Sequence, residues 1–268
     1  MSYTNGTEET RFAEIDSFRG VAVLGMVIYH VLFDLSIIGL IEVGMQNTCF
    51  EAFADTTAAL FFTIVGVSMY ISFSREKRKG EDPMLRAKKY ILRGLKLAGL
   101  GAVITGVTYL LYPEFVVLFG ALHFIGFSVI LSYILLELTR TLELPGNLLA
   151  YGIVLGVVFW LAGPVSELGV SNLFLIWLGT VPPGFQSLDY FPLLPWFGFV
   201  VSGLILGQLL YPKGRRRNNF FEFGARPAQF LGRNALIIYF AHQPAIYLGI
   251  FLFMAFTGRF ELSALSLF

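Results

Sequence analysis

The sequence predicts an all-α membrane protein, a polytopic bundle of about seven transmembrane helices. Of its 268 residues, 56% are hydrophobic and only 14% are charged, whereas soluble domains carry about 25% charged residues. Its mean hydropathy is +0.72. Apolar runs of about 17 to 23 residues alternate with short charged stretches, as a hydrocarbon core about 30 Å thick requires. Because no linker or fixed-period repeat interrupts this alternation, we expect one domain over residues 1–268.

Seven apolar runs are long enough to cross a bilayer. The segment Asn172–Val181 is too short and ends at Pro182–Pro183, so we expect a half-helix, a re-entrant piece or part of an outer loop there. We do not expect it to form an eighth span. The predicted spans are Phe18–Ile41, Phe53–Phe73, Gly94–Tyr112, Val116–Leu136, Asn147–Gly163, Phe191–Tyr211 and Asn234–Phe256.

The orientation follows from the basic residues. All but one of the 19 Lys and Arg residues fall on the same side of the predicted spans, and Arg259 is the exception. By the positive-inside rule the amino terminus is cytoplasmic and the carboxyl terminus is outside the cell membrane. The polar or mixed segment Met1–Ser17 lacks the short apolar stretch of a cleaved signal peptide, so we expect it to stay attached.

Basic residues cluster in Arg75–Lys96 and Arg215–Arg217. Such clusters set topology and contact anionic lipids, and the alternative is a phosphate-bearing ligand at the cytoplasmic face. A net charge of +1 does not indicate a nucleic-acid partner. Cys49 is the only cysteine, so an internal disulfide is excluded.

All three histidines fall within predicted spans. His30 lies eleven residues beyond Arg19 at the inner edge, about 16 Å into the membrane, and His242 lies nine residues beyond Arg233, about 13 Å in. His123 enters from the outer side and lies about 20 Å above the inner edge. The three depths agree within about 7 Å, which favours a shared polar site over three separate packing roles.

Two further residues share a helix face with His30. Asp34 follows it by four residues, so its carboxylate can orient the imidazole or hold its proton, and proton transfer is the expected use. Arg19 projects within about 20° of His30, so the two can contact opposite ends of an extended ligand. The alternative is that Arg19 is an interfacial residue paired with Asp16.

The last span begins with a polar cluster, Gly232–Pro244. Tyr239 and His242 are three residues apart and therefore neighbours on one helix face, and Pro244 loosens the helix beyond them. Two pairs of glycines at four-residue spacing indicate close helix packing, namely Gly152 with Gly156 and Gly203 with Gly207.

Several segments resemble membrane acyltransferases. Asp16-Ser17-Phe18-Arg19-Gly20 with the apolar run to His30, followed by Phe53-Ala54-Asp55 and Val65-Gly66-Val67-Ser68, resembles the opening of the transmembrane acyltransferase superfamily. More narrowly, Phe119–Gly126, Asp189–Gly198 and Gly232–Pro244 resemble prokaryotic proteins with a heparan-alpha-glucosaminide N-acetyltransferase catalytic domain. The resemblance covers nearly the whole chain.

This resemblance implies that an acyl group, typically acetyl, moves from cytoplasmic acetyl-CoA to an amine or hydroxyl of a glycan or lipid-linked acceptor outside. Related bacterial acyltransferases share an Arg-x10-His pattern, matched by Arg19 and His30, and an Arg-x-x-Arg pair, matched by Arg75 and Arg78. Lysosomal members have their active histidine in the lumenal segment after the first span. The corresponding segment here, Glu42–Ala52, has none, which leaves His30 for the role.

We therefore predict that His30 deprotonates the acceptor or briefly accepts the acyl group while Asp34 orients it. Arginines would bind the CoA phosphates, and no metal is expected. The predicted donor-binding residues are Arg19, Arg75, Arg78 and Arg93. The residues predicted to contact the acceptor or to support the site are Asp55, His123, Trp196, Asn234, Tyr239, His242 and Gln243.

Two other functional classes remain open at this stage. A secondary transporter or proton-coupled carrier would also place His and Asp in mid-membrane, but the inverted repeats expected of such a protein are not found in the sequence. A non-catalytic membrane protein would keep the fold without binding acetyl-CoA. Membrane lipids are expected partners in every case, and homo-oligomerisation stays open.

Overall fold

The computed structural model describes residues 11–41, 48–142, 145–168, 173–217 and 224–257. These residues form α-helices, three short 3-10 helices and connecting turns, and no strand is found among them. The α-helices are α1 Ala13–Ile37, α2 Thr48–Lys79, α3 Pro83–Leu111, α4 Ala121–Leu138, α5 Gly146–Glu167, α6 Leu193–Leu210, α7 Arg226–Arg233 and α8 Ala235–Thr257. The 3-10 helices are η1 Pro113–Phe115, η2 Leu173–Leu175 and η3 Pro212–Gly214.

Seven of these helices, all except α7, are long and apolar enough to cross a membrane. Each overlaps one of the seven predicted spans, so the all-α, seven-span prediction is confirmed. The described part of the Asn172–Val181 segment forms only η2 and turns. Its backbone is tied to the start of α6, because Leu193 N donates to Trp177 O at 2.8 Å. The segment is therefore a loop rather than a half-helix.

The turn between α2 and α3 shows how local sequence sets the helix ends. Gly80 has a φ of +71°, a left-handed conformation that favours glycine and ends α2. Pro83 occupies the first turn of α3, where a missing N–H costs nothing. The Asp82 carboxylate accepts a hydrogen bond of 2.9 Å from Met84 N and caps the same helix.

The chain divides into two compact units. Unit 1 comprises Met1–Phe61 with Asn218–Phe268, and unit 2 comprises Phe62–Arg217. Unit 1 contains α1, the first part of α2, α7 and α8; unit 2 contains the rest of α2 and α3 to α6. The expectation of one domain remains a prediction.

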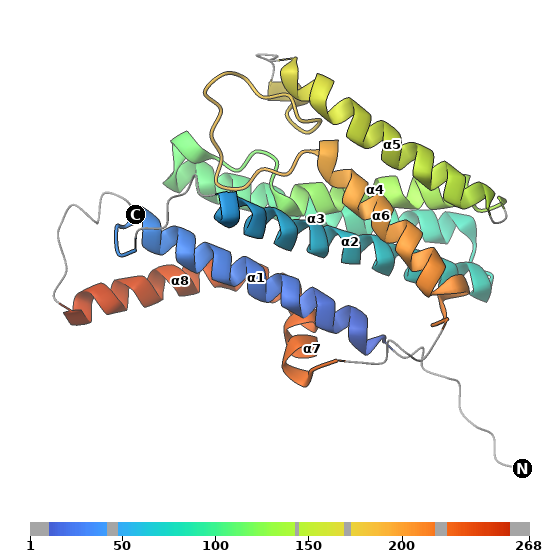
Figure 1. Ribbon diagram of the computed structural model, residues 1–268, viewed down its shortest axis with the longest axis horizontal. Coiled ribbons are helices and arrows are strands. Elements are labelled where there is room, and N and C mark those ends of the chain that lie inside the picture. The colour runs from blue at the N-terminus through green and yellow to red at the C-terminus, as the bar shows by residue number, and fades with distance from the viewer. Residues whose placement is uncertain (1–10, 42–47, 143–144, 169–172, 218–223, 258–268) are drawn as a thin grey trace, which may run out of the picture. The chain divides into compact units, whose positions relative to one another are not determined.

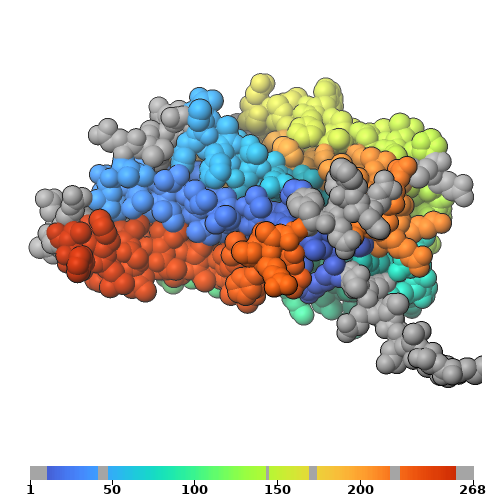
Figure 2. Space-filling view, turned by 60° about the horizontal axis from the view of Figure 1, so that its bottom comes forward, coloured from blue at the N-terminus to red at the C-terminus, as the bar shows by residue number. Residues whose placement is uncertain are grey.

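In unit 1, the short helix α7 packs tightly against the first turns of α1, and α8 runs along the rest of α1 (Figures 1 and 2). Two glycines make this close approach possible. A Cβ at Gly20 would lie 1.9 Å from Ala228 O, and a Cβ at Gly232 would lie 1.9 Å from Asp16 O. No side chain fits at either position unless the backbones separate.

In unit 2, glycines bring two pairs of helices together. A Cβ at Gly66 on α2 would lie 2.0 Å from Val200 O on α6, and one at Gly203 would lie 2.1 Å from Thr63 O. Gly94 on α3 faces Gly126 on α4 in the same way. Such small-residue seams are typical of helix packing in membranes.

The two glycine pairs of the sequence prediction have different outcomes. Gly203 and Gly207 on α6 both contact α2, as expected. A Cβ at Gly152 or Gly156 on α5 would meet no described atom within 4 Å. The close packing expected there is wrong for the described chain, since the spacing of glycines does not show which face of a helix is covered.

Candidate functional site

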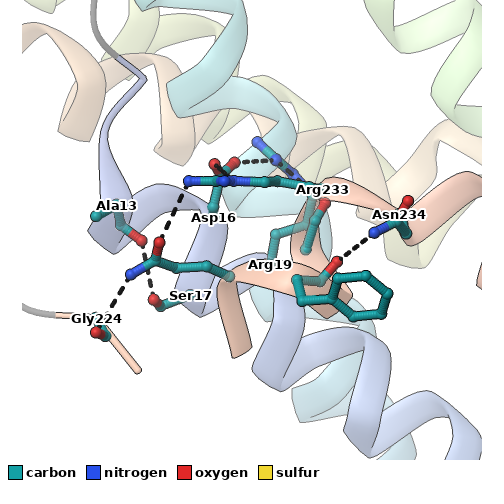
Figure 3. Close-up of polar contacts among 10 residues, drawn as sticks. Ala13, Asp16, Ser17, Arg19, Gly224, Arg233 and Asn234 are labelled. Atoms are coloured by element: carbon teal, nitrogen blue, oxygen red, sulfur yellow. Dashed lines mark hydrogen bonds and ion pairs between the residues drawn. The ribbon is translucent and has the colours of Figure 1, made fainter. Parts of the chain in front are cut away.

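An ionic cluster around the buried Asp16 joins α1 to α7 in unit 1. Asp16 is 5% exposed. Its Oδ1 lies 2.8 Å from Arg19 Nη1, and its Oδ2 accepts a hydrogen bond of 3.1 Å from Arg233 Nε. Figure 3 shows the Asp16 carboxylate joined to both arginines. The sequence offered the Asp16–Arg19 pair as the alternative to a ligand role for Arg19, and it gave no sign of Arg233, which is 217 positions away from Asp16.

A second set of hydrogen bonds fixes the end of α7 beside this cluster. Arg233 Nη2 donates to Gln229 Oε1 at 3.3 Å, and Gln229 Nε2 donates to Gly224 O at 3.2 Å. Arg19 Nη1 also lies 3.4 Å from Gly232 O. Because Asp16 offsets one positive charge and the cluster holds two arginines, it has a net charge of about +1.

Farther along α1, His30 faces His242 of α8. Their ring centroids are 4.7 Å apart and the rings are steeply inclined, at 70°. Tyr29 packs edge-on against His30 and stacks on Phe50 of α2, while Tyr239 lies 5.8 Å from the His242 ring. The structure thus brings together two of the three predicted histidines from opposite ends of the sequence.

Each histidine is oriented by a backbone carbonyl one turn away on its own helix. His30 Nδ1 lies 2.8 Å from Met26 O, and His242 Nδ1 lies 2.7 Å from Tyr239 O. A carbonyl oxygen can only accept a hydrogen bond, so each Nδ1 must carry the proton. In the neutral ring this assigns the basic lone pair to Nε2. The pair therefore offers two Nε2 atoms able to take a proton.

Asp34 connects the same two helices rather than orienting His30. It is 4% exposed, and its Oδ2 accepts a hydrogen bond of 3.3 Å from Gln243 Nε2 on α8. Gln243 Nε2 also donates to the Tyr247 hydroxyl at 3.3 Å. The orienting bond to His30 comes from Met26, so any part of Asp34 in catalysis remains a prediction.

The other predicted residues of unit 1 lie around these two groups. Asn234 stands at the junction of α7 and α8, where its Nδ2 donates to Phe230 O at 2.8 Å. Its position suits a structural role in turning the chain between the two helices. Asp55 is an exposed residue on the part of α2 that belongs to unit 1.

The remaining predicted donor-binding arginines lie in unit 2. Arg75 Nε donates to Gly214 O at 3.1 Å, and Arg78 Nη1 donates to Lys213 O at 3.1 Å. These bonds attach the end of α2 to η3. Arg93 is exposed on α3. Arg75 and Arg78 therefore have a structural task, whereas a ligand role for any of the three arginines remains a prediction.

His123 and Trp196 also lie in unit 2. His123 fits against Gly101 of α3 and stacks on Phe119 at 5.8 Å. Its Nδ1 is buried and has no hydrogen-bond partner among the described residues. Trp196 belongs to an aromatic cluster with Phe62 and Phe191, at centroid distances of 5.7 and 5.0 Å.

One residue near His123 was missed by sequence reasoning. Asp189, in the loop before α6, caps the first turn of α4: its Oδ2 accepts a hydrogen bond of 2.9 Å from Ala121 N. Next in the chain, burial raises the pKa of Tyr190 to about 12. The Tyr190 phenol accordingly stays protonated and donates to Ile176 O at 2.7 Å. The only sequence signal for Asp189 was its place at the start of the Asp189–Gly198 motif.

Comparison with protein families gives a match over most of the chain. The family described as "Heparan-alpha-glucosaminide N-acetyltransferase, catalytic" matches residues 11–244. This range runs from the start of α1 into α8 and includes both the ionic cluster and the histidine pair. The chain belongs to the heparan-alpha-glucosaminide N-acetyltransferase catalytic family.

Membership of the heparan-alpha-glucosaminide N-acetyltransferase catalytic family indicates an acetyltransferase. Together with seven apolar helices, it indicates a multi-pass membrane acetyltransferase. A comparison with curated proteins finds no match. Among the described residues, no group of three or more His, Cys, Asp or Glu side chains is placed to hold a metal ion.

Proposed function

We propose that this member of the family transfers an acetyl group from cytoplasmic acetyl-CoA to an amine or hydroxyl of a glycan or lipid-linked acceptor on the other side of the membrane. Family membership supports the acetyl transfer. The distribution of Lys and Arg supports an orientation with the first turns of α1 at the cytoplasmic side.

The observation that carries this proposal is the His30–His242 pair. A general base needs a lone pair aimed away from its own helix, and the bond from His30 Nδ1 to Met26 O supplies that geometry. A second imidazole 4.7 Å away gives the transferred proton another place to go. Histidine is the side chain best suited to exchange protons near neutral pH.

The ionic cluster supports a donor site at the start of α1. Arginine forks bind phosphate oxygens with charge-assisted hydrogen bonds. Arg19 is about 23% exposed and Arg233 about 48%, so both retain surface for a ligand while Asp16 holds them in place. Arg19 and His30 are eleven residues apart, about 16 Å along α1. That separation suits a long donor with phosphates at one end and a thioester at the other.

The proposed reaction balances without an added reagent. His30 Nε2 takes the proton of the acceptor hydroxyl or amine, and the acceptor oxygen or nitrogen attacks the thioester carbonyl carbon. When the tetrahedral intermediate collapses, the C–S bond breaks, and the CoA thiolate takes the proton from the imidazolium. In the alternative, His30 Nε2 attacks the thioester carbonyl carbon, and the C–S bond breaks to release the CoA thiolate. The acceptor then attacks the acetyl carbon, the bond to Nε2 breaks, and the acceptor proton passes to the thiolate.

The direct test is acetyl-CoA binding to the purified full-length protein in detergent, measured by calorimetry. We expect saturable binding that weakens at high salt, because phosphate contacts are screened. Acetate at the same concentration serves as a control and should not bind measurably. Absence of acetyl-CoA binding by a folded, monodisperse sample would contradict the proposal. If acetyl-CoA binds, glycan and lipid profiles of a deletion strain would identify the acceptor.

A further inference from the structure

Unit 2 contains a set of buried polar atoms that its own hydrogen bonds do not satisfy. Ser128 and Ser132 of α4 are both 0% exposed, and Gln208 of α6 is 5% exposed. The Ser128 Oγ, Ser132 Oγ and Gln208 Oε1 atoms have no hydrogen-bond partner among the described residues. The same is true of Glu76 Oε2 on α2, a residue that is also 5% exposed. We call Glu76, Gln208, Ser132 and Ser128 the polar ladder.

The serine hydroxyls of the polar ladder make no hydrogen bond to the preceding turn of their own helix. A serine or threonine within a helix usually donates to the carbonyl one turn back. Ser202 donates to Gly198 O at 2.9 Å, and Thr139 donates to Leu135 O at 2.7 Å. Ser128 and Ser132 make no such bond, although they too lie within a helix. Their hydroxyls are therefore available to a bonding partner inside the unit.

Both serines point to the same side of α4. They are four residues apart, so they share a helix face with Phe124, which contacts Phe62 of α2 at 4.4 Å. On α6, Gln208 follows the fully buried Leu204 by four residues and shares its face. The polar ladder thus lies on the interior faces of these helices and not on the outer surface of unit 2.

The four residues are spread in depth. Depths are measured from the end of unit 2 at which the turn 80–82, the C-terminus of α4 and η3 lie. We call it the basic end because Lys77, Arg78, Arg140 and Lys213 lie there. Gln208 and Glu76 lie two and three residues before their helix ends, so both are less than about 5 Å deep. Ser132 and Ser128 lie six and ten residues before Leu138, about 9 and 15 Å deep. Ser128, the deepest of the four residues, is therefore near the middle of a hydrocarbon core about 30 Å thick.

Leaving such atoms unbonded in a dry interior is costly, because each has lost its hydrogen bonds to water and gained none in return. A buried polar site with two to four bonding groups ordinarily holds water or a polar ligand. We propose that the interior of unit 2 carries a path, from its basic end to about mid-membrane, that admits small uncharged hydrogen-bonding groups. Water supplies these groups, so this proposal does not rest on the proposed function.

Cysteine accessibility tests this path. The only native cysteine, Cys49, is exposed and is replaced first by Cys49→Ser. Ser128→Cys, Ser132→Cys and Val129→Cys are then compared for their rate of reaction with a small, water-soluble methanethiosulfonate. Val129 is the matched control, because it is 1% exposed and next to Ser128 on α4 but has an apolar side chain.

Thiols react as thiolates, and a dry surrounding raises the thiol pKa. We expect the two serine positions to react about tenfold faster than Val129→Cys, since each unit of pKa changes the thiolate population tenfold. Equal, slow reaction at all three positions would overturn the proposal.

A stability measurement on alanine variants tests the same proposal without the cysteine variants, which could misfold. If Ser132 Oγ bonds to water, Ser132→Ala loses a hydrogen bond, and the melting temperature should fall by about 2–4 °C. If the interior is dry, the same change removes an unbonded polar group, and the melting temperature should rise. A rise in both Ser128→Ala and Ser132→Ala would overturn the proposal without relying on labelling or on acetyl-CoA.

Discussion

At the scale of residues, the proposal that His30 is the general base rests on one hydrogen bond and one neighbouring side chain. The Met26 carbonyl orients the ring so that Nε2 is the basic atom, and His242 lies 4.7 Å away between ring centroids. His123 belongs to unit 2, where Gly101 and Phe119 contact its ring. The three histidines therefore have different surroundings, which predicts different effects of mutation.

We expect His30→Ala to fold and to lose acetyl transfer by about 10²- to 10⁴-fold, the usual contribution of a positioned general base. His242→Ala and His123→Ala should be milder. The measurement is acetyl-CoA turnover by the three variants side by side, at matched expression and with the melting temperature of each recorded. Near-normal turnover by His30→Ala, with loss in one of the other two, would move the assignment to that residue.

Asp34→Asn should cost less activity than His30→Ala. The carboxylate bonds to Gln243 across α1 and α8, and an amide of the same size keeps an oxygen that can accept this bond. Its effect on turnover should therefore follow its effect on the melting temperature. A full loss of turnover with unchanged stability would instead give Asp34 a direct part in proton transfer.

Arg19→Ala should weaken acetyl-CoA binding by about tenfold, because the loss of a charge-assisted bond to phosphate is worth about 1.4 kcal/mol or more. Calorimetry measures this directly. The comparison variant is Arg75→Ala/Arg78→Ala, which removes two arginines tied to backbone carbonyls of η3. If affinity is unchanged in both proteins, the basic residues act only as topology signals.

At the scale of elements, the short helix α7 is the part of unit 1 that sequence reasoning missed. It has only eight residues and is not part of a long apolar run, so a search for transmembrane spans does not find it. Its presence depends on Gly20 and Gly232, which allow the backbones of α1 and α7 to touch. Through this contact Arg233 reaches Asp16.

Gly232→Ala should therefore lower the melting temperature. Its Cβ would lie 1.9 Å from Asp16 O, so the helices must separate, and overpacking of this kind costs about 1–3 kcal/mol or more. The matched control is Gly152→Ala, whose Cβ meets no described atom within 4 Å. In a helix interior that change should be neutral or stabilising by up to about 1 kcal/mol. Equal melting temperatures for the two variants would show that α7 does not pack as described.

At the scale of the whole molecule, topology determines which side of the membrane each group faces. Seven spans and the one-sided distribution of basic residues predict a cytoplasmic amino terminus and an external carboxyl terminus. The turn between α2 and α3, which is flanked by basic residues on both helices, should then be cytoplasmic, together with the ionic cluster at the start of α1.

A topology reporter fused after Phe268 should be external, and one inserted after Gly80 should be cytoplasmic. Fluorescent and periplasmically active reporters at both points measure this. The Gly80 insertion serves as the internal control, because it lies among the basic residues that set the orientation. Two reporters on the same side would contradict an odd number of spans between Gly80 and Phe268 and would require the helices to be reassigned.

The number and approximate limits of the spans followed from the sequence by itself, because a bilayer imposes length and apolarity locally on each helix. The Asp16–Arg19 pair and the shared face of Tyr239 and His242 were also within reach, since helical spacing decides them. Only the tertiary structure decided that His242 faces His30, that Arg233 shares Asp16, and that Asp34 bonds to Gln243. These contacts join residues more than 200 positions apart, and periodicity along one helix carries no information about which face of another helix it will meet.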